Sequence, residues 1–200
     1  MTSQIAEKHC IGRIVFILLV LVASGGSLQA TVVPRIGFAE LNGSAARIVH
    51  ARCVATEAFM EASSGTIWTR HQFVILDTLK GEVTAHIVIT EPGGIVGGQG
   101  QWVAGAPRFA PGDESVLFLS QTVTGKWRVF GWGQGNFRVT RDAVSGETRV
   151  KPDLAGAELV VPAGSNSESA IVAPNEPGTA ETLDGLKARI RNQLVRQGLP

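Results

Sequence analysis

The segment from Glu91 to Phe109, EPGGIVGGQGQWVAGAPRF, is rich in glycine, which phosphate-binding loops use to bring the backbone close to a ligand. Six glycines lie between Gly93 and Gly105. A Walker loop needs Lys and then Ser or Thr after its last glycine, and a dinucleotide loop needs glycines at its first, third and sixth positions before a helix. The segment has neither pattern, and it has no basic residue before Arg108. We therefore predict no nucleotide site and expect the glycines to form turns and bulges.

Histidine and cysteine could also carry chemistry, and after residue 30 the chain holds His50, Cys53, His71 and His86. None has HxH or HExxH spacing, and strand alternation puts His50 on the face opposite Cys53. A Ser or Cys nucleophile needs a histidine base within reach, and the chain has no GxSxG motif. We predict no catalytic set, no metal and no cofactor. In the alternative, His71, which shares a face with Phe73, joins strand-end carboxylates in a metal-dependent hydrolase.

The aromatic residues gather in the second half of the chain, where they include Trp102, Phe109, Trp127 and Trp132. In the segment 126–132 they fall on both faces of a predicted strand, so one face should pack the core and the other a helix or a partner. We expect Trp102 and Phe109 to hold the glycine segment on the domain. Exposed, coplanar Trp102 and Trp132 would instead line a carbohydrate groove.

The region from about residue 46 to 151 has the pattern of short strands separated by turns. Seven segments are rich in β-branched and aromatic residues: 46–55, 66–79, 84–90, 114–121, 126–132, 136–141 and 147–151. Glycine or small polar residues separate these segments, where the backbone must reverse. Because no helical pattern intervenes, residues 31–151 predict a mainly β domain, either a small β-barrel or a sandwich.

The composition changes at Pro152. Residues 152–178 contain four prolines and no Lys, Arg or His, which is typical of a linker. Residues 179–198 then predict an amphipathic α-helix, because apolar residues recur at helical spacing: Leu183, Leu186, Ile190 and Leu194. We expect this helix to dock on the barrel. A basic helix that binds a partner or a membrane surface is the alternative.

The first thirty residues have the pattern of a secretory signal peptide. Lys8 and Arg13 precede an apolar run over residues 14–23, and the small residue Ala30 ends the segment. The run is shorter than the about twenty residues that a membrane-spanning helix needs. We expect residues 1–30 to be removed and the protein to be exported to the periplasm or the extracellular space. Membrane anchoring would follow only if the segment stays uncleaved.

The charge of the remaining chain is balanced. Residues 1–30 hold two of the 18 Lys and Arg residues and one of the 17 Asp and Glu residues, which leaves sixteen of each in 31–200. This balance gives no basic footprint for nucleic acid and no strong attraction to anionic lipid. Cys53 is the only cysteine after residue 30, so it cannot form an intramolecular disulfide there. We expect a buried structural thiol, with pairing between chains as the alternative.

Short motifs follow one another in a characteristic order over residues 46–141. They are Leu79-Lys80-Gly81, Gly93-Gly94, Pro107 to Glu114, Leu117-Phe118-Leu119 and Gln134-Gly135-Asn136-Phe137. In this order the chain resembles a family of exported bacterial proteins of unknown function. It departs from the family pattern at Asp113, which lengthens one turn by a residue. The resemblance implies an exported β-barrel domain and assigns no activity.

More distantly, the layout is similar to netrin-like modules, the OB-type barrels found in tissue inhibitors of metalloproteinases. This resemblance implies a small OB-like (netrin-like) barrel. Those inhibitors chelate the protease zinc through an N-terminal cysteine. Here Thr31 is expected at that position, and the inhibitors' disulfides are lacking. The resemblance therefore carries over the fold and not the inhibition.

Together these observations predict an exported, non-enzymatic binding module that acts on a protein or cell-surface partner, including an exported hydrolase to which it would be an accessory. A metal-dependent hydrolase using His71 and a carbohydrate-binding module are the alternatives. Long loops often carry function, so we expect the recognition surface on the glycine segment and the tryptophan nearby. Its residues are Gly93, Gly94, Gly97, Gly98, Trp102, Arg108, Phe109 and Trp132.

Overall fold

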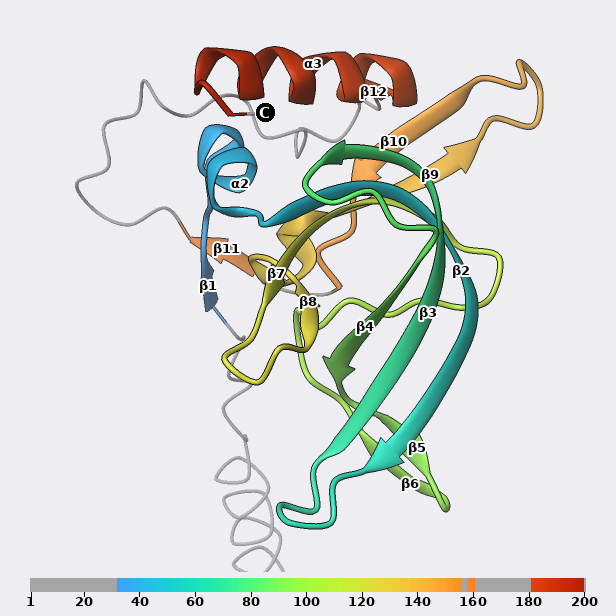
Figure 1. Ribbon diagram of the computed structural model, residues 1–200. Coiled ribbons are helices and arrows are strands. Elements are labelled where there is room, and N and C mark those ends of the chain that lie inside the picture. The colour runs from blue at the N-terminus through green and yellow to red at the C-terminus, as the bar shows by residue number, and fades with distance from the viewer. Residues whose placement is uncertain (1–31, 156–157, 161–180, 200) are drawn as a thin grey trace, which may run out of the picture. The chain divides into compact units, whose positions relative to one another are not determined.

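The computed structural model describes residues 32–155, 158–160 and 181–199 of the 200-residue chain. The predicted signal segment and most of the predicted linker lie outside the described residues. The elements, labelled in Figure 1, are β1 (Val32–Pro34), α2 (Phe38–Ser44), β2 (Arg47–Met60), β3 (Ile67–Lys80), β4 (His86–Pro92), β5 (Gly94–Val96), β6 (Gln99–Gln101), β7 (Glu114–Gln121), β8 (Trp127–Val129), the 3-10 helix η1 (Trp132–Gly135), β9 (Asn136–Arg141), β10 (Thr148–Pro152), β11 (Glu158–Val160), β12 (Glu181–Thr182) and α3 (Leu183–Arg196).

The main sheet closes into a five-stranded barrel. Its strand order is β12-β10-β9-β7-β2-β3-β4-β8, and β8 also pairs with β7, which closes the ring β7-β2-β3-β4-β8. All pairs in this ring are antiparallel except β4–β8, which is parallel and shares the single register pair Ile89–Trp127. The predicted mainly β fold is confirmed, and the structure resolves the choice between sandwich and barrel as a barrel.

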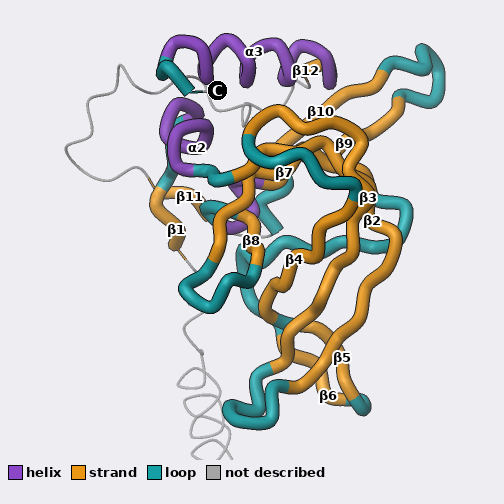
Figure 2. The backbone as a smooth tube through the Cα atoms, viewed as in Figure 1, coloured by secondary structure: helices purple, strands orange, loops and turns teal. Residues whose placement is uncertain are grey.

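Strands β2 and β3 form the longest wall of the barrel, with 14 residues each. Their pairing contains three irregularities, the first between Ile48 and Val49, where a strand can bend sharply. Such bends allow two long strands to wrap around a small barrel, as the tube in Figure 2 shows. Strand β2 therefore continues to Met60, well beyond the predicted end at residue 55.

Alternation along the strands divides the buried side chains into two cores. Val49, Ala51 and Cys53 point into the barrel, which confirms the predicted face and the buried Cys53 thiol. Ile48 and Phe118 point outward and pack under the helices. We call these two regions the barrel interior and the helix-covered layer.

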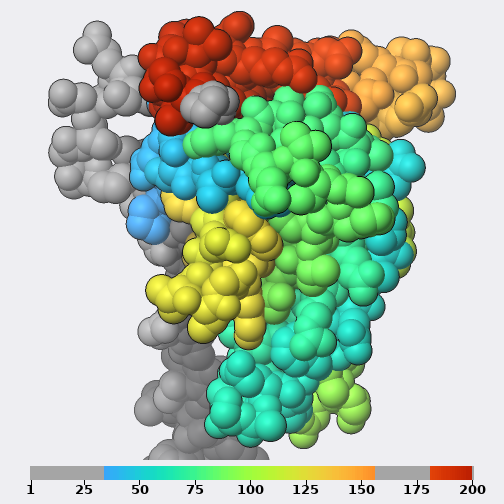
Figure 3. Space-filling model, in the orientation of Figure 1, coloured from blue at the N-terminus to red at the C-terminus, as the bar shows by residue number. Residues whose placement is uncertain are grey.

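Helices α2 and α3 cover one side of the sheet, and Figure 3 shows them in contact. In α3 the predicted stripe is confirmed, because Leu186, Ile190 and Leu194 are buried against the helix-covered layer. Helix α2 is absent from the sequence prediction. It has only seven residues, two of them the poor helix formers Asn42 and Gly43. Tertiary contacts stabilise it, including two hydrogen bonds from Lys80 Nζ to its last carbonyl oxygens.

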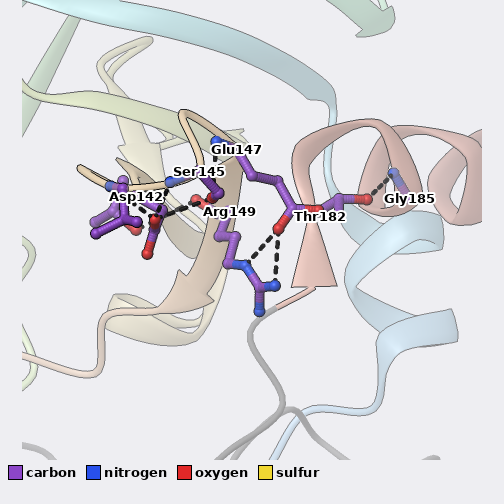
Figure 4. A network of polar contacts seen from close by, with 8 residues as sticks. Asp142, Ser145, Glu147, Arg149, Thr182 and Gly185 are labelled. Atoms are coloured by element: carbon purple, nitrogen blue, oxygen red, sulfur yellow. Dashed lines mark hydrogen bonds and ion pairs between the residues drawn. The ribbon is translucent and has the colours of Figure 1, made fainter.

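Side-chain caps fix the start of α3 and the β9–β10 turn (Figure 4). Thr182 Oγ1 accepts a hydrogen bond from the Gly185 N–H at 3.1 Å, which caps the first turn of the helix. In the turn, the Asp142 carboxylate accepts hydrogen bonds from the N–H and the hydroxyl of Ser145. The turn joins the paired strands β9 and β10, and β10 also pairs with β12, which leads directly into α3.

The chain's start and part of the predicted linker also pair with each other. Strand β11, inside the predicted 152–178 linker, runs parallel to β1. Gln134 of η1 binds the end of β1 and the residues after it with both ends of its side-chain amide. Its Oε1 accepts from the Ile36 N–H at 2.8 Å, and its Nε2 donates to the Pro34 carbonyl at 2.9 Å. The Gln-Gly-x-Phe motif therefore anchors the N-terminal segment to the barrel.

Candidate interaction site

The glycine segment folds into an antiparallel hairpin of β5 and β6. Gly97 and Gly98 form its two-residue turn at φ +56° and +81°, a conformation that favours glycine in tight hairpins. This confirms that these glycines serve the fold. The hairpin itself escaped prediction, because its strands have only three residues each and β6 contains no β-branched or aromatic residue.

Hydrogen bonds at its base hold the hairpin against the start of β3. The Gly93 N–H donates to the Ile67 carbonyl, and the Ile67 N–H donates to Gln101 Oε1, each at 2.7 Å. Thr69 Oγ1 donates to the Gly93 carbonyl at 2.7 Å. A Cβ on Gly94 would lie 2.5 Å from Thr69 Oγ1, so only glycine permits this close approach. Gly93 and Gly94 are therefore anchors, which corrects their predicted place on the recognition surface.

The two faces of the hairpin differ in character. Gly94 and Gln101 pair across it and lie on the side that meets the barrel. The next pair, Ile95 and Gly100, therefore lies on the outer side, and alternation brings Trp102 to that side as well. Ile95 is 75% exposed and Trp102 is 70% exposed. Trp102 thus faces solvent, contrary to the prediction that it holds the segment on the domain.

At the end of the segment, Arg108 lies at the surface and Phe109 lies in the core. The Arg108 guanidinium lies over the Trp102 ring. Phe109 is 6% exposed, and its ring meets Phe73 edge-on at a centroid distance of 5.0 Å. Phe109 is therefore the core anchor, as predicted, and not part of a recognition surface. Arg108 contacts Trp102, and the hairpin register places Ile95 on the same side; we call these three residues the hairpin site.

Trp132 belongs to a different group of side chains. It begins η1 at φ +60°, is half-buried, and lies 5.2 Å from the guanidinium of Arg128. The centroid of the Trp68 ring lies 5.7 Å from the same guanidinium. Arg128 in turn pairs with Glu91. Trp132 thus packs around a paired arginine, which corrects its predicted place beside Trp102.

Glu91 is a buried carboxylate that sequence reasoning missed. It is 1% exposed, Oε1 accepts from the Val129 N–H at 2.7 Å, and Oε2 lies 3.1 Å from the Arg128 guanidinium. Because β4 and β8 share a single register pair, Ile89–Trp127, the Glu91 side chain continues their bonding beyond it. Burial raises the pKa of Glu91 to about 7, and Arg128 opposes the shift.

His71 lies in the barrel interior rather than at a metal-ready edge. It is 3% exposed, its ring meets the Phe109 ring at 5.1 Å, and Nδ1 has no hydrogen-bond partner among the described residues. Burial lowers the pKa of His71 to about 4, against a smaller opposing effect of Asp113. Asp113 itself binds Arg138 at 2.9 Å. Within the part of the chain that the structure describes, no three His, Cys, Asp or Glu side chains gather as metal ligands.

A second histidine has a carboxylate partner on the outside of the barrel. His50 Nε2 lies 2.7 Å from Glu114 Oε1, and Arg52 binds the other carboxylate oxygen at 3.0 Å. Burial lowers the pKa of His50, and Glu114 acts in the opposite direction. The sequence signal was the outward position of His50 and Arg52, but the pairing of β2 with β7 was needed to find Glu114.

Comparison of the chain with protein-family models, with curated proteins and with solved structures gives no match. None of the helices over the described residues is long and apolar enough to span a membrane.

Proposed function

We propose that this chain is an exported, non-enzymatic binding module and that its hairpin site engages a protein partner. The observation that carries the proposal is the 70% exposed Trp102 on a hairpin whose base is fixed by hydrogen bonds. Tryptophan and arginine dominate binding energy at protein interfaces. An anchored loop also loses little conformational entropy when it binds.

The location of the hairpin supports the same function. It lies against the first residues of β3, whereas α3 contacts Asp77 near the other end of that strand. The site is therefore separate from the helices that cover the domain (Figure 1). The strand order, with one parallel pair, supports the OB-type interpretation, and such barrels commonly bind ligands through their loops.

The alternatives have less support in the geometry. A carbohydrate groove would need Trp102 and Trp132 to present free ring faces, but Arg108 covers Trp102 and Arg128 lies beside Trp132. A hydrolase centred on His71 would need carboxylates in contact with it, and the nearby Asp113 binds Arg138.

Partner capture with matched variants tests the proposal. The purified protein without residues 1–30 is immobilised, exposed to the exported fraction of its source cells, and the captured proteins are quantified. Trp102→Ala and Ile95→Ser should each lower recovery of the partner by about tenfold or more, since they remove exposed contacts. Val144→Ser is the control, because Val144 is 97% exposed on the β9–β10 turn. Equal recovery by Trp102→Ala and the control would contradict the proposed site.

Export is tested separately by N-terminal sequencing of the protein recovered from the exported fraction. Thr31 should be the first residue if the signal segment is removed. Recovery of the protein only from the cytosol, with Met1 or Thr2 at its start, would contradict export and leave the hairpin site to be judged by the capture experiment.

A further inference from the structure

We propose that the partner of the hairpin site presents a carboxylate next to a large apolar side chain on a protein segment. Arg108 binds the carboxylate, and Trp102 with Ile95 receives the apolar group. This inference rests on the proposed function and goes beyond it by naming the chemistry of the partner.

The charge of Arg108 is unmatched within the described structure. From Pro92 to Gly112 it is the only ionisable side chain. Among the described residues it forms no ion pair or side-chain hydrogen bond, and its contact is with the Trp102 ring. Other arginines of the barrel have carboxylate partners, as in Arg52–Glu114 and Arg138–Asp113. The hairpin site therefore offers one positive charge that has no partner among the described residues, and a negative group is its complement.

The stacking of Arg108 on Trp102 favours a carboxylate as that group. A guanidinium that lies on an aromatic ring uses its flat face for the ring and keeps the N–H donors at its edge free. Those donors match the two oxygens of a carboxylate in a bidentate pair. Stacking also restricts the arginine side chain before binding, which lowers the entropy cost of forming that pair.

Two observations favour a protein segment over an acidic sugar. Arg108 covers a face of the Trp102 ring, and sugars bind tryptophan by stacking on such faces. Ile95 adds a 75% exposed aliphatic side chain on the same side of the hairpin. An aliphatic surface gains by burying another apolar side chain and gives a sugar hydroxyl no hydrogen bond.

Selection from a random 12-residue peptide library tests this chemistry. The wild-type protein without residues 1–30 should enrich peptides in which Asp or Glu lies within about three residues of Leu, Ile, Phe or Trp. A synthetic peptide of the enriched sequence should bind Arg108→Gln about tenfold more weakly or worse. Arg108→Lys should also lose affinity, because lysine keeps the charge but not the fork of donors. The control is Arg141→Gln, which changes an exposed arginine at the end of β9.

The outcomes separate this inference from the function on which it rests. Enriched peptides without an acidic residue, or acidic peptides that bind wild type and Arg108→Gln equally, overturn the partner chemistry. So does a selection that enriches nothing. In each of these cases, loss of the captured partner in Trp102→Ala still supports the binding function. Binding to a glycan array, with no protein captured, would overturn both in favour of a carbohydrate ligand.

Discussion

Ionisable side chains have different surroundings in the helix-covered layer and in the barrel interior. Beside the helices, His50 binds Glu114 at 2.7 Å, and Asp77 of β3 binds Lys187 of α3 at 2.9 Å. Inside the barrel, His71 is almost fully buried with no partner for Nδ1 among the described residues. Glu91 is buried as well, although the Arg128 guanidinium and the Val129 N–H bind its carboxylate.

Glu91 and His71, the two ionisable groups in the barrel interior, lie close to the hairpin site along the chain or in space. Glu91 comes two residues before Gly93, and His71 packs on Phe109, the residue after Arg108. Burying such groups costs stability, which apolar burial elsewhere must offset. The comparison teaches that the ionisable groups beside the helices lie in ion pairs at the edge of an apolar core, whereas the end of the barrel that carries the proposed site buries Glu91 and His71, whose protonation changes the stability of the fold.

Removing a large side chain from the helix-covered layer should have the largest effect. Phe118 is fully buried, and its ring packs against Phe137 at 5.5 Å and Phe38 at 6.3 Å. Phe118→Ala should lower the free energy of unfolding by about 3–5 kcal/mol, measured by urea denaturation. The control Val123→Ala changes a fully exposed residue and should cost less than about 0.5 kcal/mol. A loss below about 1.5 kcal/mol in Phe118→Ala would mean that this layer is not a packed core.

Glu91 should make the protein less stable as the pH rises. Its pKa is raised from 4.5 to about 7 in the fold, so the folded state binds the proton more tightly than the unfolded state. The stabilisation is complete below pH 4.5 and is lost as the pH rises through 7, by at most about 3 kcal/mol. Glu91→Gln should remove this contribution, measured as the difference from wild type by urea denaturation between about pH 4.5 and 7.5.

Glu61→Gln serves as the control for that pH series. It changes a partly exposed carboxylate that pairs with Lys126 and leaves Glu91 in place, so the wild-type slope should remain. An identical slope in wild type and Glu91→Gln would show that the buried carboxylate does not change its protonation on unfolding.

His71 should act in the opposite direction and on the acid side. Its pKa falls from 6.5 to about 4 in the fold, so the unfolded state takes up a proton first as the pH drops. The contribution of His71 therefore lowers the free energy of unfolding as the pH falls from 6.5 to 4, by at most about 3 kcal/mol, and it opposes the gain from Glu91 over much of that range. His71→Leu should be less acid-sensitive than wild type in urea denaturation at pH 7, 6 and 5. The exposed His86→Gln is the control, and equal acid sensitivity in all three proteins would refute the assignment.

Local patterns predicted much of the fold, and non-local pairing decided the rest. Alternation placed Cys53 with Val49 and Ala51, and the apolar stripe predicted α3, because both signals lie within one element. Barrel closure depends on the parallel β4–β8 pair between segments almost 40 residues apart, which no local pattern encodes. Helix α2 forms because tertiary contacts override its weak propensity.

The candidate site was predicted in part for a similar reason. Trp102 and Arg108 could be selected by type and by their place in a long loop. Ile95 could not, because its exposure follows from the hairpin register with Gly100. Glu91 stands before Pro92 and reads as the end of a strand, so its burial becomes visible only when β8 is placed beside it.

The smallest effect is expected from removing the cap at the start of α3, at the edge of the helix-covered layer. Thr182 Oγ1 accepts the Gly185 N–H at 3.1 Å and caps α3 (Figure 4). Thr182→Ala should lower the free energy of unfolding by about 1 kcal/mol, measured by urea denaturation, whereas Thr182→Ser keeps the hydroxyl and should cost much less. The loss should be the same at pH 5 and pH 8, since the hydroxyl does not titrate there. An equal loss in both variants would show that the threonine methyl group, and not the cap, stabilises this end of the helix. A loss that varied with pH would contradict this assignment, because it would mean that an ionisable group, and not the hydroxyl alone, determines the effect of the cap.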